Sequence, residues 1–280
     1  MESYLQFTFQ LAAGPMQELL IATLCDWPFE GFEEQSEQLI AFIPESACTP
    51  DLRATIASLA ADYNILSIDE KIIPPTNWNA DWESSYAAVV VDDFCVVRAD
   101  FHPSYPQVQH QILITPKMSF GTGHHATTFM MIQAMQAINF ENAKVLDYGC
   151  GTAVLAILAA KLGATEIAAI DNDSWAYQNS LENIELNDCQ AIIDVAEGDW
   201  SIVEKDAIYD VILANINRNI ILQSMSAMAA QLAEAGTLLC SGFLQNDVEL
   251  IVESAAGVGL QCIISNKKEQ WHCLGFKKEK

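Results

Sequence analysis

From residue 143 onward, short β-branched apolar runs alternate with amphipathic segments of helical length, and this alternation restricts the fold more than any other feature. Seven apolar runs occur, namely AKVLDYG (143–149), EIAAID (166–171), AIIDVAEGDW (191–200), YDVILANI (209–216), TLLCSGF (237–243), LQCIISNKKEQW (260–271) and HCLGFKK (272–278). Repeated strand, helix, strand units fold into a mostly parallel sheet with helices on both faces. The sequence therefore predicts an α/β domain with seven strands and a ligand site at their carboxyl ends.

The first 75 residues carry a different pattern and predict a second domain. At 280 residues the chain is long for one domain and short for three. Strand-like and helix-like segments follow one another from YLQFTFQLA (4–12) to ILSIDEKII (65–73), which predicts a small α+β domain over 1–75. In the polar stretch 76–86, Trp78 and Trp82 stand four residues apart, so both rings would share one face of a short linker helix. Residues 87–280 then form the larger domain.

The charge balance narrows the choice of partners. The chain has 13 Lys and Arg against 37 Asp and Glu, a formal net charge of −24. Proteins that bind nucleic acid need a wide basic face for the phosphates, so we expect no direct nucleic-acid partner. The negative electrostatic field of such a chain would attract a basic protein or peptide, although the acidic residues can also serve only to keep the protein soluble.

Cysteine placement and hydropathy indicate the compartment. The eight cysteines include no Cys-x-x-Cys pair, which predicts reduced thiols in a cytoplasm. The first residues, MESYLQFTFQL, lack the basic segment of a signal peptide, and no uncharged apolar run reaches the roughly 18 residues of a membrane span. We therefore expect a cytoplasmic protein without a membrane anchor; the sequence does not indicate its oligomeric state.

The stretch VLDYGCGTA (145–153) has the form of a ligand-binding turn. Gly149 and Gly151 follow an apolar strand, where glycine lets the backbone turn tightly and admits a ligand against its amides. Asp171 ends the next strand 20 residues after Gly151, the interval at which a carboxylate meets ribose hydroxyls. A dinucleotide fingerprint would place a third small residue at 154, but the residue is Val154. Asp147 just before the turn instead suits a ligand with a cationic centre such as S-adenosylmethionine, unless Asp147 is only a capping or turn residue.

Asn215 ends the strand YDVILANI and is a candidate for substrate contact. An amide oxygen at this end of the sheet could accept a hydrogen bond from an amine awaiting methylation. Enzymes that methylate exocyclic or amide nitrogens often carry two prolines after this asparagine, and both are absent here, which disfavours an adenine or glutamine substrate. The alternative is an ordinary turn residue.

The stretch FGTGHHATT (120–128) has two interpretations, a metal site or a loop over a ligand. Adjacent histidines project in different directions on most backbones, and no further Cys or His cluster accompanies the pair. We therefore predict no metal, and a glycine-containing loop that runs into a helix and folds over the ligand.

Together, FGTGHHATT, LDYGCGTAVLAILAAKLGA, AIDND and ANI resemble the ribosomal protein L11 methyltransferase family. The resemblance implies a Rossmann-like class I methyltransferase domain behind a small ferredoxin-like α+β domain that recognises the ribosomal protein. It also implies transfer of methyl groups from S-adenosylmethionine to lysine side chains or the N-terminal amine of ribosomal protein L11. Trp78 and Trp82 would then lie in a mobile linker or simply pack between the domains.

The resemblance also assigns roles to individual residues. It implies S-adenosylmethionine contacts, all within the larger domain, from Thr128, Asp147, Gly149, Gly151, Asp171 and Asn215. Asn215 would also position the amine during catalysis. The chain departs from the family pattern at three places, Ala126, Ala153 and Asn217. The alternatives are a small-molecule methyltransferase with the same cofactor domain and a binding protein that has lost catalysis.

Overall fold

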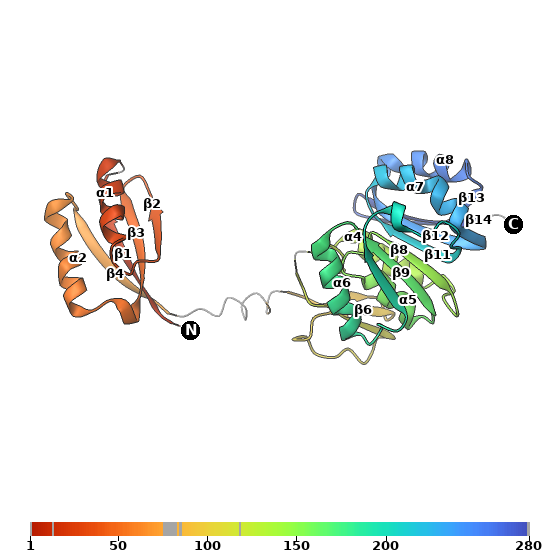
Figure 1. The fold of residues 1–280 in the computed structure, drawn as a ribbon, viewed down its shortest axis with the longest axis horizontal. Helices are drawn as coiled ribbons and strands as arrows, with labels where there is room; N and C mark the ends of the chain where they lie inside the picture. Colours follow the sequence, from red (N-terminus) through yellow and green to blue (C-terminus); the bar gives the residue numbers. More distant parts are fainter. Residues whose placement is uncertain (1, 13, 75–82, 84–85, 118, 279–280) are drawn as a thin grey trace. The chain divides into compact units, whose positions relative to one another are not determined.

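The computed structural model describes residues 2–12, 14–74, 83, 86–117 and 119–278. The chain divides into two compact units, Met1–Tyr86 and Ala87–Lys280 (Figure 1). The predicted linker helix over 76–86, with Trp78 and Trp82, lies outside the described residues except for Glu83 and Tyr86.

The described part of the first unit contains a four-stranded antiparallel sheet together with helices. Its elements run β1 (Tyr4–Gln10), α1 (Pro15–Leu24), β2 (Gly31–Glu34), β3 (Gln38–Pro44), α2 (Pro50–Asp62) and β4 (Ser67–Ile73). The strand order β2-β3-β1-β4 is that of the predicted ferredoxin-like fold. Alternation along β1 places Leu5, Phe7 and Phe9 in the core, and both helices begin with a proline, where the missing amide costs little.

The second unit opens with a small three-stranded sheet of β5 (Val89–Val91), β6 (Cys95–Arg98) and β7 (His110–Leu113). The larger sheet contains β8 (Lys144–Tyr148), β9 (Glu166–Asp171), β10 (Ile193–Glu197), β11 (Tyr209–Asn215), β12 (Leu232–Leu244), β13 (Leu260–Lys268) and β14 (Trp271–Lys278). Their order among the described residues is β10-β9-β8-β11-β12-β14-β13, and β14 runs opposite to the other strands of this sheet. This is the mostly parallel seven-stranded sheet predicted from the alternation of apolar runs.

Helices cover both faces of this sheet. The helices are α4 (Ala126–Met135), α5 (Val154–Lys161), α6 (Ser174–Leu186), α7 (Arg218–Gln231) and α8 (Val248–Ala256). One core packs α4 and α5 against the sheet, and a second core packs α7 and α8 against it (Figure 1). The strand order reverses beside β8, so the carboxyl ends of β8 and β11 border the crevice in which such sheets bind ligands.

Several predicted strand boundaries differ from the structure, most clearly that of β12. The run TLLCSGF predicts a strand that starts at residue 237, but α7 ends at Gln231 and β12 already begins at Leu232. Leu232 pairs with Tyr209 before a register shift in the ladder, and Ala235 has a φ of 59°. Sheet pairing therefore overrides a run of residues with high helix propensity. None of the described helices has the length and apolar character that a membrane span requires.

Candidate functional site

The glycine turn between β8 and α5 is held by segments distant in sequence. Gly149 and Gly151 have φ angles of 77° and 55°, in the left-handed region that favours glycine. A Cβ on Gly149 would overlap the Ile216 side chain, and a Cβ on Gly151 would overlap the backbone oxygen of Phe120. Both glycines are therefore required by close approach as well as by backbone conformation.

Asp171 joins the carboxyl ends of β8 and β9. Its Oδ2 accepts a hydrogen bond from the Gly151 amide at 2.8 Å, and its Oδ1 accepts one from the Asp173 amide at 3.0 Å. A carboxylate offers about four lone pairs, so acceptor capacity remains on both oxygens. The 20-residue interval recognised in the sequence thus corresponds to a direct contact between Asp171 and the turn.

Asp147 lies beneath the same turn and is completely buried. Its Oδ2 accepts a hydrogen bond from the Ala156 amide at 3.1 Å in the first turn of α5, so the capping role considered from the sequence is observed. Its Oδ1 has no hydrogen-bond partner within the described residues. Burial raises the pKa of Asp147 to about 7, the Ala156 amide opposes the rise, and the negative charge of Asp171 adds to it.

The raised pKa of Asp147 predicts a pH dependence of stability. Because the folded state holds the proton more tightly than the unfolded state, this group destabilises the fold as pH rises from about 4 to about 7. Between pH 5 and pH 8, wild type should lose about 2 to 3 kcal/mol of unfolding free energy relative to Asp147→Asn. Urea unfolding of both proteins at several pH values measures this difference; parallel pH profiles would contradict it.

Asn215 at the end of β11 meets Thr128 in α4. Its Nδ2 donates a hydrogen bond to Thr128 Oγ1 at 3.1 Å. Its Oδ1 is buried and finds no partner in the described part of the chain. Thr128 is itself fully buried, so this hydrogen bond is shielded from water. An acceptor oxygen is thereby left available at the carboxyl end of the sheet.

The loop over 120–125 is bonded to the turn and runs into α4 as predicted. The Thr152 amide and hydroxyl donate to the backbone oxygens of Phe120 and Gly121, at 3.0 and 2.8 Å. His124 Nε2 lies 2.9 Å from the Ala87 oxygen, whereas His125 is the N-cap residue of α4. The histidines thus serve different backbone contacts, and no group of three metal-ligating side chains occurs among the residues that the structure describes.

Two adjoining pockets lie along these carboxyl ends. A pocket of about 230 Å³ brings together five of the predicted residues and adds Phe120 from the loop. The predicted residues that line it are Thr128, Gly149, Gly151, Asp171 and Asn215. A neighbouring pocket of about 480 Å³ shares Gly149 and Asp171 with it and extends to Asp199 and Trp200. Asp147 lines neither pocket and lies behind the turn.

Sequence reasoning missed several residues of this region. Asp199 and Trp200 follow β10 in the segment GDW, and their position after a parallel strand was the available signal. The ring of His125 lies 5.1 Å from that of Phe120 and 4.8 Å from that of Trp271, between ring centroids. Trp271 begins β14, and nothing local in its sequence indicates this meeting.

Comparison with known proteins decides the family. The sequence profile of a family described as Ribosomal protein L11 methyltransferase (PrmA) matches residues 24–279. The chain belongs to the ribosomal protein L11 methyltransferase family. A Porphyromonas gingivalis protein described as a ribosomal protein L11 methyltransferase is 39% identical over 285 residues, covering 98% of this chain and 97% of its own. A Bacteroides fragilis relative with the same description is 35% identical over 277 residues, which cover 98% of this chain and 99% of the relative.

A solved structure agrees with the family assignment. The ribosomal protein L11 methylase of Lactobacillus delbrueckii subsp. bulgaricus superposes with a TM-score of 0.62 at 26% identity. The superposition covers 70% of this chain and 100% of the Lactobacillus chain. The similarity to this L11 methylase thus extends over most of the chain.

The three departures from the family pattern all have structural roles here. Ala153 has a φ of 61° and precedes α5, a left-handed conformation that costs alanine roughly 1 to 2 kcal/mol. The Asn217 side chain caps α7 by accepting from the Ile220 amide at 3.2 Å. Ala126 is the buried first residue of α4.

Proposed function

We propose that this protein transfers methyl groups from S-adenosylmethionine to amino groups of ribosomal protein L11, on lysine side chains or the N-terminus. Family membership supports the donor and the substrate protein. The observation that carries the chemistry is the buried Asn215 Oδ1 without a partner among the described residues, beside the glycine turn. An amine is a donor that such an oxygen suits.

The residues around the turn fit the methyl donor. Asp171 keeps acceptor capacity for ribose hydroxyls, and Gly149 and Gly151 present backbone without side chains. We assign Thr128 and Asn215 to the part of the donor nearest the reacting centre. Asp147 lies behind the turn, and a positive charge on the bound donor would lower the pKa of Asp147 and so favour its ionised form. S-adenosylmethionine supplies an electrophilic methyl group on a positively charged sulfur. The protein's own contribution is to bind, orient and exclude water.

The substrate amine must reach the site without its proton. A lysine has an ordinary pKa near 10.4, so presenting it neutral at pH ~7 costs about 4 to 5 kcal/mol. The rings of Phe120, His125 and Trp271 lie together, and Phe120 is exposed at the border of the smaller pocket. A substrate that covers this ring would remove water from its amine, which lowers the pKa of the amine. His125 Nδ1 accepts a hydrogen bond from the Thr127 amide at 3.3 Å, so this nitrogen is engaged in capping α4. We therefore assign no dedicated base. We propose that the protein promotes the reaction by desolvating the substrate amine and aligning it with the methyl group.

The first unit, with its acidic surface, is proposed to recognise the basic ribosomal protein. Residues 1–86 contain 14 Asp and Glu against two Lys and Arg, within the chain's overall charge of −24. Such a field attracts a cationic partner and speeds encounter. We retain the expectation that nucleic acid is not a direct partner, and we place the reaction in the cytoplasm, where ribosomal proteins are made.

Transfer of label tests the proposal. The full chain is incubated with methyl-labelled S-adenosylmethionine and unmodified ribosomal proteins, and label is located by gel and intact mass. We expect label on L11 alone, in steps of one methyl mass, and its loss when residues 1–86 are deleted. Cofactor binding without labelling of any ribosomal protein would instead favour the small-molecule methyltransferase.

A further inference from the structure

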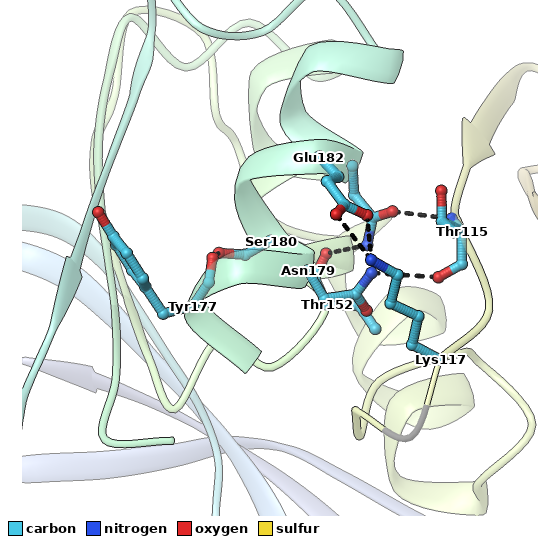
Figure 2. A network of polar contacts seen from close by, with 8 residues as sticks. Thr115, Lys117, Thr152, Tyr177, Asn179, Ser180 and Glu182 are labelled. Atoms are coloured by element: carbon cyan, nitrogen blue, oxygen red, sulfur yellow. Dashed lines mark hydrogen bonds and ion pairs between the residues drawn. The ribbon is translucent and has the colours of Figure 1, made fainter. Parts of the chain in front are cut away.

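Asn179 and Asn183 of α6, with Asn187 at its C-cap, form a ladder along the end of β7 and the backbone that follows it. Asn187 exchanges two hydrogen bonds with Leu113, accepting from its amide at 3.1 Å and donating to its oxygen at 2.7 Å. Asn183 accepts from the Thr115 amide at 2.8 Å, and Asn179 donates to the Thr115 oxygen at 3.2 Å. Figure 2 shows Asn179 facing Thr115, with the Lys117–Glu182 ion pair on the same side of α6. These carboxamides do for the backbone what a neighbouring strand would do.

The spacing of the asparagines explains the ladder. Residues 179, 183 and 187 are four apart and share one helix face, whereas Leu113 and Thr115 are two apart and share one edge of extended backbone. All three side chains are buried, and each makes at least one hydrogen bond to this backbone, which offsets the cost of burying an amide; only Asn179 Oδ1 has no partner among the described residues. The face is therefore built to hold the segment that leads into the loop over 120–125.

Asn187 Nδ2 also donates to the Asn183 backbone oxygen at 2.8 Å, and Asn183 makes a contact that Asn187 lacks. Asn183 Nδ2 donates a hydrogen bond to the Thr152 oxygen at 3.0 Å, in the glycine turn. Thr152 in turn donates from its amide to Phe120 and from its hydroxyl to Gly121. All three polar groups of Thr152 are thus engaged, and both borders of the smaller pocket are tied to α6 through one residue.

We propose that Asn183, acting through Thr152, is a positioning residue for the cofactor pocket. It fixes the turn of Gly149 and Gly151 relative to Phe120, so that the pocket is formed before the ligand arrives. Removing its carboxamide leaves the Thr115 amide and the Thr152 oxygen without partners, and the turn relaxes away from the loop. This inference rests on the proposed function, because it takes S-adenosylmethionine as the ligand of that pocket.

Asn187 provides a matched control for Asn183. Both side chains are buried on the same face of α6 and bond the same strand extension, but only Asn183 reaches the turn. Asn183→Leu and Asn187→Leu are compared with wild type in the full chain. Affinity for S-adenosylhomocysteine is measured by isothermal titration calorimetry, and amide hydrogen exchange is followed over residues 119–123 and 149–153.

Asn183→Leu should weaken S-adenosylhomocysteine binding about tenfold and speed exchange in both segments. Both variants should lower the melting temperature by similar amounts, but Asn187→Leu should keep the wild-type affinity for S-adenosylhomocysteine. Equal affinities for the two variants would overturn the proposal. Absence of binding by wild type would instead count against the proposed function itself.

A second variant serves if Asn183→Leu does not fold. Thr152→Val removes only the hydroxyl bond to Gly121 and leaves the asparagine ladder untouched. A loss of affinity of about tenfold supports coupling through Thr152. Wild-type affinity in this variant would overturn it.

Discussion

Asn215→Ala is expected to lower kcat on ribosomal protein L11 about 100-fold, because the methyl transfer loses the acceptor that aligns the amine. The buried Oδ1 of Asn215 has no other use among the described residues, and its Nδ2 is already engaged by Thr128. Single-turnover kinetics with saturating S-adenosylmethionine isolates the effect on the chemical step. Calorimetry with S-adenosylhomocysteine separately measures the weaker effect that we expect on cofactor affinity.

Two further variants make this prediction specific. Asn219→Ala changes an exposed asparagine of the same segment whose side-chain oxygen accepts hydrogen bonds from Arg218, and its kcat should stay at the wild-type value. Thr128→Val removes the acceptor that orients the Asn215 carboxamide, and it should cost about tenfold in kcat. Because Thr128 acts on the amine through Asn215, the double variant should have the kcat of Asn215→Ala alone. Full turnover by Asn215→Ala would exclude this asparagine from amine positioning.

Much of the site could be predicted because parallel strands collect their carboxyl ends at one edge. Asp147 and Asp171 end successive strands, and the glycines of the intervening turn must then lie beside them. Period-two and period-3.6 patterns are local, so the sequence contains them directly. The 20-residue spacing recognised in the sequence brings Asp171 into direct hydrogen-bond contact with the Gly151 amide.

The rest depends on contacts between distant segments. The Asn215 to Thr128 bond joins residues 87 apart, and Trp271 meets His125 only because β14 inserts between β12 and β13. The asparagines of α6 show that a polar pattern can also mislead. A polar helix face ordinarily indicates solvent, but here Asn179 and Asn183 are buried against extended backbone that needs hydrogen-bond partners.

Gly151→Ala is expected to weaken S-adenosylhomocysteine binding about 100-fold. The added Cβ would overlap the Phe120 backbone oxygen, which also accepts the Thr152 amide bond. The added Cβ and the Phe120 oxygen both belong to or sit directly on the backbone, so no flexible side chain can yield. The loop must therefore move away from the turn. Overpacking of this kind costs about 1 to 3 kcal/mol, and the pocket between Phe120 and Gly151 is the part that deforms.

Gly259→Ala separates this clash from backbone strain. Gly259 has a φ of 78°, also in the left-handed region, but a Cβ there meets nothing within 4 Å. Both variants therefore carry a strain of about 1 to 2 kcal/mol in the folded state, and denaturant unfolding should detect it in each. Only Gly151→Ala should lose cofactor affinity in calorimetry. If both variants bound S-adenosylhomocysteine like wild type, the loop would tolerate displacement, and its close approach to the turn would not shape the pocket.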